Sequence, residues 1–310
     1  MPLQPLAHRR AQCYKAATGS PAGSSGGSRR VDGSQAVALG IVAASAAIVG
    51  SMLGLGGGFF LVPIFTLFFG VDQKLAIGAS AVAVVTNSVV GSTVHLRSGF
   101  TNLRLAMLLQ VTMASGALLG ALTSVFAPER YINAIFGAVL LYAAVSMALR
   151  RQAVAADASR PDPWRLGATY YDPAARRTVR YVPERVGIGL GVSGVAGVIS
   201  GMLGVGGGVV QVPAMNLLMR VPVKAAAGTS AFMVGITSVA TAFVFYAEEK
   251  MDPRVVVPAM IGIFAGSQAG SRLTRHVRTQ RLVLVFVLVL LYLGGSLLLK
   301  AAGITLPGQK

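Results

Sequence analysis

Two glycine-rich blocks carry the clearest chemical signal in this chain of 310 residues. The first reads GSMLGLGGG over residues 50–58 and the second reads SGMLGVGGG over residues 200–208, and a Val-Pro pair follows each block. Three consecutive glycines do not sustain a helix. A helix that begins after them presents free N–H groups and a positive dipole end, so the blocks predict a binding site for a small anion.

Both blocks lie within long apolar segments, where open backbone is tolerated only if protein or water satisfies its polar groups. Residues 54–58, here named the first glycine break, and residues 204–208, the second glycine break, are therefore expected inside a helix bundle. Close helix packing is the alternative use of such glycines. The substrate-binding residues predicted at the breaks are Gly54, Gly56, Gly57, Gly58, Pro63, Gly204, Gly206, Gly207, Gly208, Gln211 and Pro213.

Hydroxyl and amide side chains follow each break in the sequence. Ser80, Thr229 and Ser230 are donors that can bind an oxyanion, although each could instead bond back to its own helix. Asn87 is costly against lipid and is expected to face inward, where it could line a path or bond one helix to another. These four residues complete the predicted substrate-binding set.

Three further residues are candidates for steering or coupling. Lys74 and Lys224 stand at the starts of apolar segments, where they could attract anions or extend toward lipid headgroups. Histidine side chains titrate near neutral pH, which makes His95 the best lone candidate for a proton carrier, although its position at a helix end beside Arg97 favours an interfacial role. The sequence leaves open whether a proton or a sodium ion is coupled to transport.

The composition is that of a polytopic membrane protein. Hydrophobic residues make up 54% of the chain and charged residues 12%, and the mean hydropathy is +0.67. The net charge of +17 is spread over the N-terminal tail, the central loop and short turns. This distribution indicates membrane lipids as partners and argues against nucleic acid.

The sequence repeats itself at an offset of 150 residues, for example at Lys74 and Lys224 and at Gly78 and Gly228. Each half contains about five apolar segments. Those at 57–70 and 206–219 are too short to cross about 30 Å of hydrocarbon at about 1.5 Å per residue. We therefore expect an all-α polytopic membrane protein with two inverted repeats and with glycine-broken or re-entrant helices.

The expected organisation follows from these segments. It comprises a disordered basic tail over 1–33, a first membrane repeat over 34–150, a polar interfacial loop over 151–185, a second repeat over 186–301 and a short tail over 302–310. An odd number of crossings per half collects most basic residues on the side of the central loop, which predicts a cytoplasmic loop in a bacterial inner membrane. An even count would place the basic tail inside as well, and the odd count is only slightly favoured.

Several chemistries are not encoded. The chain has no Walker lysine pattern. Its three histidines and single Cys13 have no metal-ligand spacing, and the glycine blocks lack the context of a dinucleotide loop. We therefore expect no catalytic residues, no metal and no cofactor.

The paired LGxGGGxxxVP blocks, the Lys-x-Ala-x-Gly-x-Ser stretches and the aromatic central loop resemble the TauE/SafE family of membrane permeases, over residues 36–300. The resemblance implies transport of small sulfur-containing or carboxylated anions such as sulfite, sulfoacetate or thiosulfate. It also implies that the two glycine breaks, with Pro63 and Pro213, form the core of the site. The second half is more polar there, with Gln211 against Leu61 and Thr229 against Ala79.

Our interpretation is a permease that moves such an anion by alternating access of its two repeats. The alternatives are an anion channel, a membrane partner or assembly protein without transport of its own and, as the weakest, a membrane-embedded enzyme. Whether the chain forms a homo-oligomer is left open by the sequence.

Overall fold

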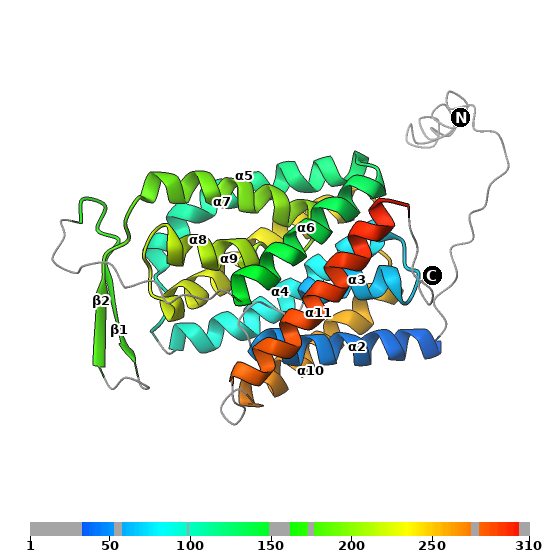
Figure 1. The fold of residues 1–310 in the computed structure, drawn as a ribbon, viewed down its shortest axis with the longest axis horizontal. Coiled ribbons are helices and arrows are strands. Elements are labelled where there is room, and N and C mark those ends of the chain that lie inside the picture. Colours follow the sequence, from blue (N-terminus) through cyan, green and yellow to red (C-terminus); the bar gives the residue numbers. More distant parts are fainter. Residues whose placement is uncertain are drawn as a thin grey trace, which may run out of the picture. The chain divides into compact units, whose positions relative to one another are not determined.

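The computed structural model describes residues 33–52, 58–97, 99–148, 162–172, 177–273 and 279–303. These ranges form ten helices and one two-stranded hairpin (Figure 1). The helices of the first half are α2 (Gly33–Met52), α3 (Gly58–Leu67), α4 (Gln73–Arg97), α5 (Leu103–Phe126) and α6 (Glu129–Ala148). Those of the second half are α7 (Val186–Leu203), α8 (Gly208–Leu217), α9 (Val223–Ala247), α10 (Pro253–Leu273) and α11 (Thr279–Ala301).

The helix bounds repeat at the offset that the sequence shows. Helices α3 and α8 have 10 residues each and begin and end 150 residues apart, and so do α4 and α9, with 25 residues each. Helices α5 and α10 also begin 150 residues apart, as do α6 and α11. The duplication therefore extends from the residues to the elements.

Helices α3 and α8 are too short to cross a bilayer, which confirms the expectation from the apolar segments. Ten residues rise about 15 Å, against about 30 Å of hydrocarbon. Within the described ranges, four helices are long and apolar enough to cross a membrane, and they are Gln73–Thr93 of α4, α5, α7 and α9. The fold is thus that of an all-α polytopic membrane protein.

Two pairs of equivalent helices pack against each other in antiparallel fashion. Near the start of α4, Gly78 faces Lys250 just beyond the end of α9, whereas further along α4 Ser88 donates a hydrogen bond of 2.6 Å to the Ala231 carbonyl near the start of α9. Helices α6 and α11 also pack together, with Gly137 close to Gly294. The equivalent helices of these two pairs therefore run in opposite directions.

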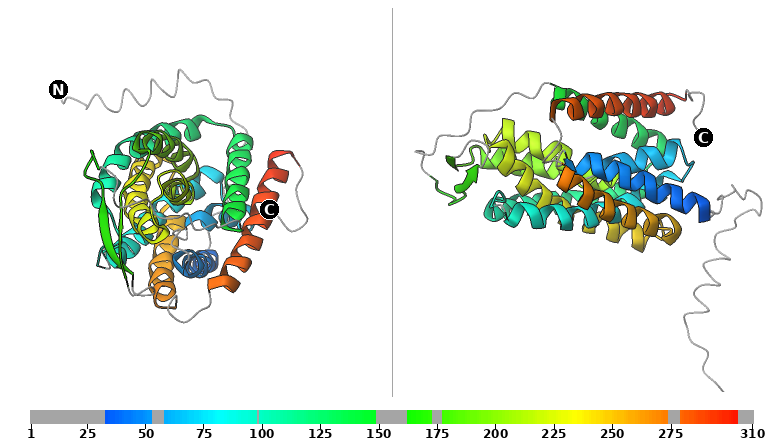
Figure 2. Two further views of the ribbon diagram at one scale, coloured as in Figure 1. Left: turned by 60° about the vertical axis from the view of Figure 1, so that its left-hand side comes forward. Right: turned by 90° about the horizontal axis from the view of Figure 1, so that it is seen from below.

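Two further helix pairs form across the two halves. Helix α5 packs on α7 and α2 packs on α10, as the blue and orange helices of Figure 2 show. A Cβ atom added at Gly116 of α5 would overlap the Gly194 carbonyl, and one added at Gly266 of α10 would overlap the Ala44 carbonyl. Both members of this second contact lie 150 residues from those of the first. At each of these two equivalent crossings, a glycine thus lets the two helices approach closely.

These contacts define two groups of helices. The first bundle contains α2, α3, α4 and α10, and the second bundle contains α5, α7, α8 and α9. Each bundle takes three helices from one half of the sequence and one from the other half. The two bundles meet along α4 and α9.

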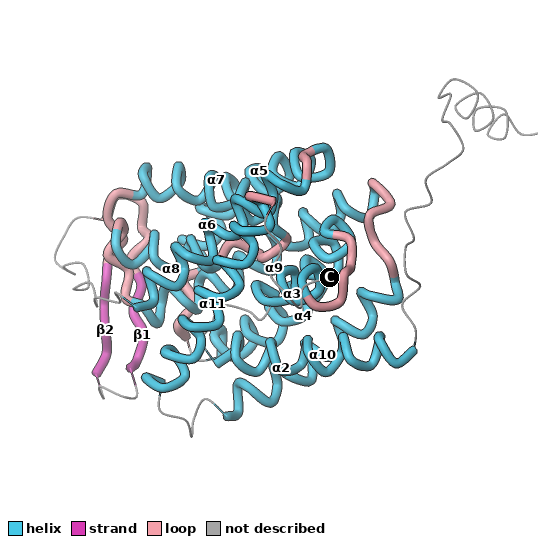
Figure 3. Tube along the Cα trace, turned by 45° about the vertical axis from the view of Figure 1, so that its right-hand side comes forward, coloured by secondary structure: helices cyan, strands magenta, loops and turns pink. Residues whose placement is uncertain are grey.

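A hairpin between the two halves was not anticipated by the sequence analysis, which predicted an interfacial loop there. Strand β1 (Ala168–Asp172) pairs antiparallel with β2 (Arg177–Tyr181), and Figure 3 shows both at one end of the helices. The Asn102 side chain, which caps α5, donates a hydrogen bond of 2.7 Å to the Leu166 carbonyl. The Tyr181 ring is 1% exposed. The hairpin is therefore anchored to the start of α5.

Replacing Gly120 with alanine should destabilise the protein, because the added methyl group would overlap the Val198 carbonyl where α5 crosses α7. Overpacking of this kind costs about 1–3 kcal/mol. Gly91→Ala in α4 is the matched control, since no atom of the described residues lies within 4 Å of its added Cβ. Thermal unfolding of the two detergent-purified variants measures both effects. Equal melting temperatures of Gly120→Ala and Gly91→Ala would contradict the close crossing of α5 and α7.

Tyr181 should be the last tyrosine to ionise as pH rises. Burial raises the pKa of Tyr181 to about 12, although the hydrogen bond with Asn102 acts in the opposite direction. The stability from burying the neutral ring is present below pH of about 10, the ordinary tyrosine value, and is lost as pH rises toward 12. Ultraviolet titration should show one late tyrosinate that Tyr181→Phe removes. A wild-type titration completed near pH 10 would refute the burial.

Candidate functional site

The second glycine break joins α7 to α8 through left-handed backbone. Gly204, Gly206 and Gly207 have φ angles of 67°, 78° and 74°. Gly204 is the C-cap of α7, and Gly207 is the N-cap of α8. Residues with a Cβ are strained at such angles, so the reversal between the two helices requires glycine. Of the first break, Gly58 begins α3, whereas the predicted residues Gly54, Gly56 and Gly57 lie outside the described residues.

Residues 204–208 are all buried and lie inside the helix bundle. A Cβ added at Gly206 would lie 2.5 Å from a methyl carbon of Val234 in α9 and 2.9 Å from one of Val84 in α4. One added at Gly207 would lie 2.5 Å from the Met113 methyl group of α5. The break is therefore enclosed by helices of both bundles, and its glycines leave no room for a side chain.

The Ser80 hydroxyl joins the two halves at their breaks. Its Oγ lies 2.9 Å from the Gly58 carbonyl oxygen and 3.0 Å from the Gly204 carbonyl oxygen. The single hydroxyl proton is shared between these two acceptors, one from each half. Ser230, the equivalent of Ser80, has its Oγ 3.3 Å from the Cβ position of Gly208, and Ser80 has the same separation from the Cβ position of Gly58.

Two buried hydroxyl groups flank the second break without a hydrogen-bond partner in the described part of the chain. They belong to Ser200 of α7 and Ser238 of α9, which are 0% and 1% exposed. The Ser238 Oγ lies 2.9 Å from the Cβ position of Gly206, and the Ser200 Cβ lies 3.1 Å from that of Gly207. A buried hydroxyl that makes no hydrogen bond costs about 1–3 kcal/mol, so each position needs an explanation.

Two buried glutamines lie in the same bundle. The Gln211 amide nitrogen donates a hydrogen bond of 2.8 Å to Ser193 Oγ, and the Gln110 amide nitrogen donates one of 3.1 Å to Thr237 Oγ1. The side-chain oxygens of both glutamines are buried and unpartnered within the ranges described. Gln211 was predicted from the sequence, whereas Gln110, Ser200 and Ser238 were not placed in the site. An amide inside an apolar segment was the signal that could have found Gln110.

The other predicted polar residues make contacts between helices or with a loop. Thr229 Oγ1 accepts a hydrogen bond of 3.0 Å from the Asn102 backbone N–H. Asn87 is buried, and its side-chain oxygen accepts a hydrogen bond from the Ser267 hydroxyl of α10. Pro63 and Pro213 lie inside α3 and α8. Asn87 thus faces inward, as expected, and there it joins two helices.

The candidates for steering and coupling lie at helix ends. The Lys74 ammonium donates a hydrogen bond to the Val125 carbonyl at the C-terminal end of α5, where the helix dipole favours a cation. Lys224 is exposed in the first turn of α9. His95 lies near the end of α4, and its side chain is outside the described residues. Neither lysine is brought to the second break by a described hydrogen bond.

Two cavities lie away from the second break. One of about 520 Å³ lies at the base of the hairpin, and one of about 300 Å³ lies between the start of α6 and the end of α11. No residue of the second break lines either of them. Among the residues that the structure describes, no three His, Cys, Asp or Glu side chains come together as a metal site.

Comparison with known proteins identifies the family. The model of the sulfite exporter TauE/SafE family matches residues 39–297. The chain is 25% identical to the probable membrane transporter protein YunE of Bacillus subtilis (strain 168), over 84% of this chain and 96% of that protein. It is 26% identical to a probable membrane transporter protein of Xylella fastidiosa (strain 9a5c), over 80% of this chain and 92% of the relative.

A shorter match reaches a plant protein. The sulfite exporter TauE/SafE family protein 6 of Arabidopsis thaliana is 31% identical over 35% of this chain and 26% of its own length. No solved structure gives a significant match. Because the family model covers the helices of both halves, the chain belongs to the sulfite exporter TauE/SafE family and is a multi-pass membrane transporter.

Proposed function

We propose that this protein is a secondary transporter that moves a small sulfur-containing or organic anion, such as sulfite, thiosulfate or sulfoacetate, by alternating access. The observation that carries the proposal is the pair of buried hydroxyl groups of Ser200 and Ser238, which adjoin the second glycine break and have no hydrogen-bond partner among the described residues. Both side chains carry a hydroxyl group that can donate a hydrogen bond, and both lie beside the start of α8. This arrangement suits an oxyanion that accepts several hydrogen bonds at once.

The chemistry of the second break favours a negative ligand. The first N–H groups of a helix have no partner within that helix, and the helix dipole makes its N-terminus electropositive. The start of α8 is enclosed, so water screens this field weakly. Hydrogen bonds from hydroxyl and backbone N–H groups to an ionised oxygen are about twice as strong as neutral ones. The site therefore needs no charged side chain to hold an anion.

The substrate contacts are concentrated in the second bundle. Ser200 has Gly50 as its equivalent, and Gln211 has Leu61, so the first half lacks both polar groups. Ser88, the equivalent of Ser238, is already engaged with the Ala231 carbonyl. The unsatisfied donors and acceptors described near the second break thus belong to α5, α7, α8 and α9. The names of the family and of its relatives support a sulfur oxyanion as the substrate class.

Alternating access fits the two bundles, which would rock against each other along α4 and α9. The equivalent helices are antiparallel, as inverted repeats require, so the two conformations would be related by exchanging the roles of the repeats. The Ser80 hydrogen bond to Gly204 runs from the first bundle to the second. Because the second break is enclosed, this structure would correspond to a conformation in which the substrate site is accessible from neither side of the membrane.

We assign the end of the helices at which the β1–β2 hairpin lies to the cytoplasm of a bacterial cell. The start of α5, the hairpin and the turn between α8 and α9 meet there, since Arg104 bonds to the Arg165 carbonyl and the Glu184 N–H bonds to the Met219 carbonyl. Arg185 and Arg220 add further positive charge to this end. Basic residues between membrane segments favour the cytoplasmic side, so the grouping supports the orientation given by an odd number of crossings per half.

Substrate counterflow in proteoliposomes tests the function directly. Vesicles loaded with unlabelled sulfite or thiosulfate should transiently accumulate labelled anion above its external concentration. A carrier exchanges one anion for another, whereas a channel only equilibrates label along its gradient. Accumulation supports alternating access, and passive equilibration of the same anion would support a channel instead.

Removing the two unpartnered hydroxyls should lower transport without destabilising the fold. Ser200→Ala with Ser238→Ala breaks no hydrogen bond in the described structure, so the melting temperature should be unchanged or higher. Two lost donors to a charged ligand, at about 1.5–3 kcal/mol each, predict at least a hundredfold weaker apparent affinity in counterflow.

The control for this variant is Ser115→Ala. The Ser115 hydroxyl is exposed and bonds back to the Val111 carbonyl of its own helix at 2.9 Å, so its loss should change neither affinity nor stability. Normal affinity in the double variant would remove Ser200 and Ser238 from the site. A large loss of melting temperature would show instead that the two hydroxyls stabilise the fold.

A further inference from the structure

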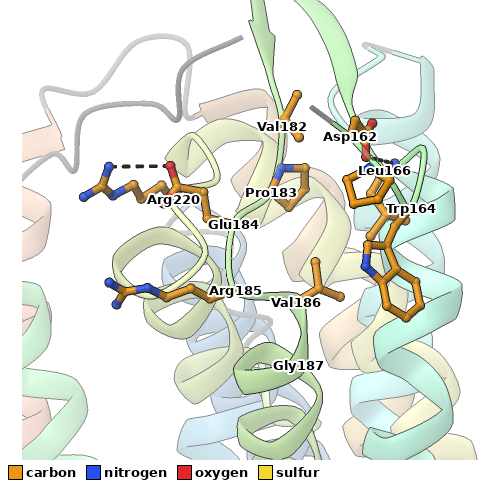
Figure 4. A pocket seen from close by; sticks show the side chains of 11 residues that line it. Asp162, Trp164, Leu166, Val182, Pro183, Glu184, Arg185, Val186, Gly187 and Arg220 are labelled. Atoms are coloured by element: carbon orange, nitrogen blue, oxygen red, sulfur yellow. Dashed lines mark hydrogen bonds and ion pairs between the residues drawn. The ribbon is translucent and has the colours of Figure 1, made fainter. Parts of the chain in front are cut away.

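The cavity at the base of the hairpin lies where the chain enters α7. It has a volume of about 520 Å³, and its lining includes Asp162 and Trp164 before β1, Glu184 and Arg185 after β2, and Arg220 from the turn after α8. Figure 4 shows the side chains of Arg185 and Arg220 on one side of the cavity and the Trp164 indole on the other. The cavity thus combines two cations with an amphipathic ring.

Both carboxylates in the lining already have partners. The Asp162 carboxylate accepts hydrogen bonds of 2.9 Å from the Leu166 N–H and 2.6 Å from the Gly167 N–H. Glu184 pairs with Arg220 at 3.5 Å. Arg185 is exposed and has no ion-pair partner in the part of the chain that the structure describes. A negative group that enters the cavity therefore meets one free guanidinium and a second that is shared.

Arg220 occupies a backbone position that suits glycine. Its φ is 52°, and the equivalent residue of the first half, Gly70, has a φ of 62°. A left-handed conformation costs a residue with a Cβ roughly 1–2 kcal/mol. Arginine is thus held here against its backbone preference, which points to a use for its side chain. Replacing it with glycine removes the guanidinium without adding backbone strain.

The cavity continues into an exposed stripe on α7. Gly187 lines the cavity, and Ile188, Gly191 and Val195 follow on the same face of the helix, all four of them exposed. No atom of the described residues lies within 4 Å of a Cβ added at Gly187 or Gly191, so the described helices leave the stripe uncovered. Helix α7 is long and apolar enough to cross a membrane, so we expect its exposed face to meet acyl chains. A soluble anion would use only the cavity, whereas a phospholipid would use both.

We propose that this cavity binds the headgroup of an anionic phospholipid. The phosphate lies beside Arg185 and Arg220, Trp164 lies at the level of the headgroups, and an acyl chain follows the stripe of Gly187, Ile188, Gly191 and Val195. Tryptophan is enriched at membrane interfaces, and each basic residue near an anionic leaflet contributes about 1 kcal/mol. This lipid site is separate from the second glycine break and does not depend on which anion is transported.

Trp164 provides the readout, because it is the single tryptophan of the chain. The purified full-length protein is reconstituted in phosphatidylcholine vesicles that contain a small fraction of brominated phosphatidylglycerol or, for comparison, brominated phosphatidylcholine. Bromine quenches indole fluorescence at short range. We expect stronger quenching by the anionic lipid at equal mole fraction, and half-maximal quenching at a lower mole fraction.

Arg185→Gln and Arg220→Gly should each raise that midpoint about fivefold, which corresponds to about 1 kcal/mol per basic residue. Arg180→Gln is the control, because Arg180 is exposed on the hairpin and does not line the cavity. Equal quenching by the two lipids, or the same midpoint in all three variants, would overturn the proposal.

Soluble glycerol phosphate separates a lipid site from a site for free anions. If it abolished the preference for phosphatidylglycerol at millimolar concentration, the cavity would bind a free phosphate and the lipid assignment would fail. Retained preference supports the lipid. Circular dichroism of each variant shows whether the helices are intact, and Arg220→Gly keeps the test available if Arg185→Gln does not fold.

Discussion

Broken helices inside a membrane leave backbone carbonyl and N–H groups that only the protein can satisfy, and the rest of this structure depends on how that is done. The Ser80 hydroxyl lies within hydrogen-bond distance of carbonyl oxygens at both breaks, those of Gly58 and Gly204. One side chain of α4 thereby holds the start of α3 against the end of α7. This contact requires α4 to lie in the centre of the molecule.

The exchange of helices between halves follows from the same arrangement. With α4 and α9 at the centre, α5 packs on α7 and α2 packs on α10, so each bundle contains one helix from the other half. Glycines at these crossings let the backbones touch, at Gly116 and Gly266 among others. The unsatisfied hydroxyls of Ser200 and Ser238 both lie in the second bundle. A symmetric scaffold thus carries an asymmetric set of polar groups.

The sequence predicted much of the scaffold, since its repeat and its glycines are visible without coordinates. The offset of 150 residues fixed which helices correspond, and the short apolar segments anticipated α3 and α8. The positive φ angles of Gly206 and Gly207 explain why glycine stands there. Which helices pair is decided by contacts far apart in the chain, such as Gly120 with Val198, and no local pattern reveals them.

The candidate site was predicted less completely, for physical reasons. A serine in a membrane helix usually bonds to its own backbone, as Ser115 does, so the free hydroxyls of Ser200 and Ser238 are visible only once their neighbours are known. The sequence also did not reveal that Thr229, predicted to bind the substrate, accepts a hydrogen bond from the Asn102 backbone N–H beside the hairpin. The aromatic and β-branched residues of 169–171 and 178–181 were a strand signal that the sequence analysis did not use.

The most direct test of the central claim is whether the purified protein binds a sulfur oxyanion at all. Its melting temperature in detergent should be measured with sulfite, thiosulfate, sulfoacetate, simple carboxylates and chloride. A ligand that binds only the native state stabilises it by about 2.7 kcal/mol at a hundred times its Kd. The account expects a selective rise with at least one sulfur oxyanion over chloride. Folded protein whose melting temperature responds to none of these anions would contradict an anion site at the second glycine break.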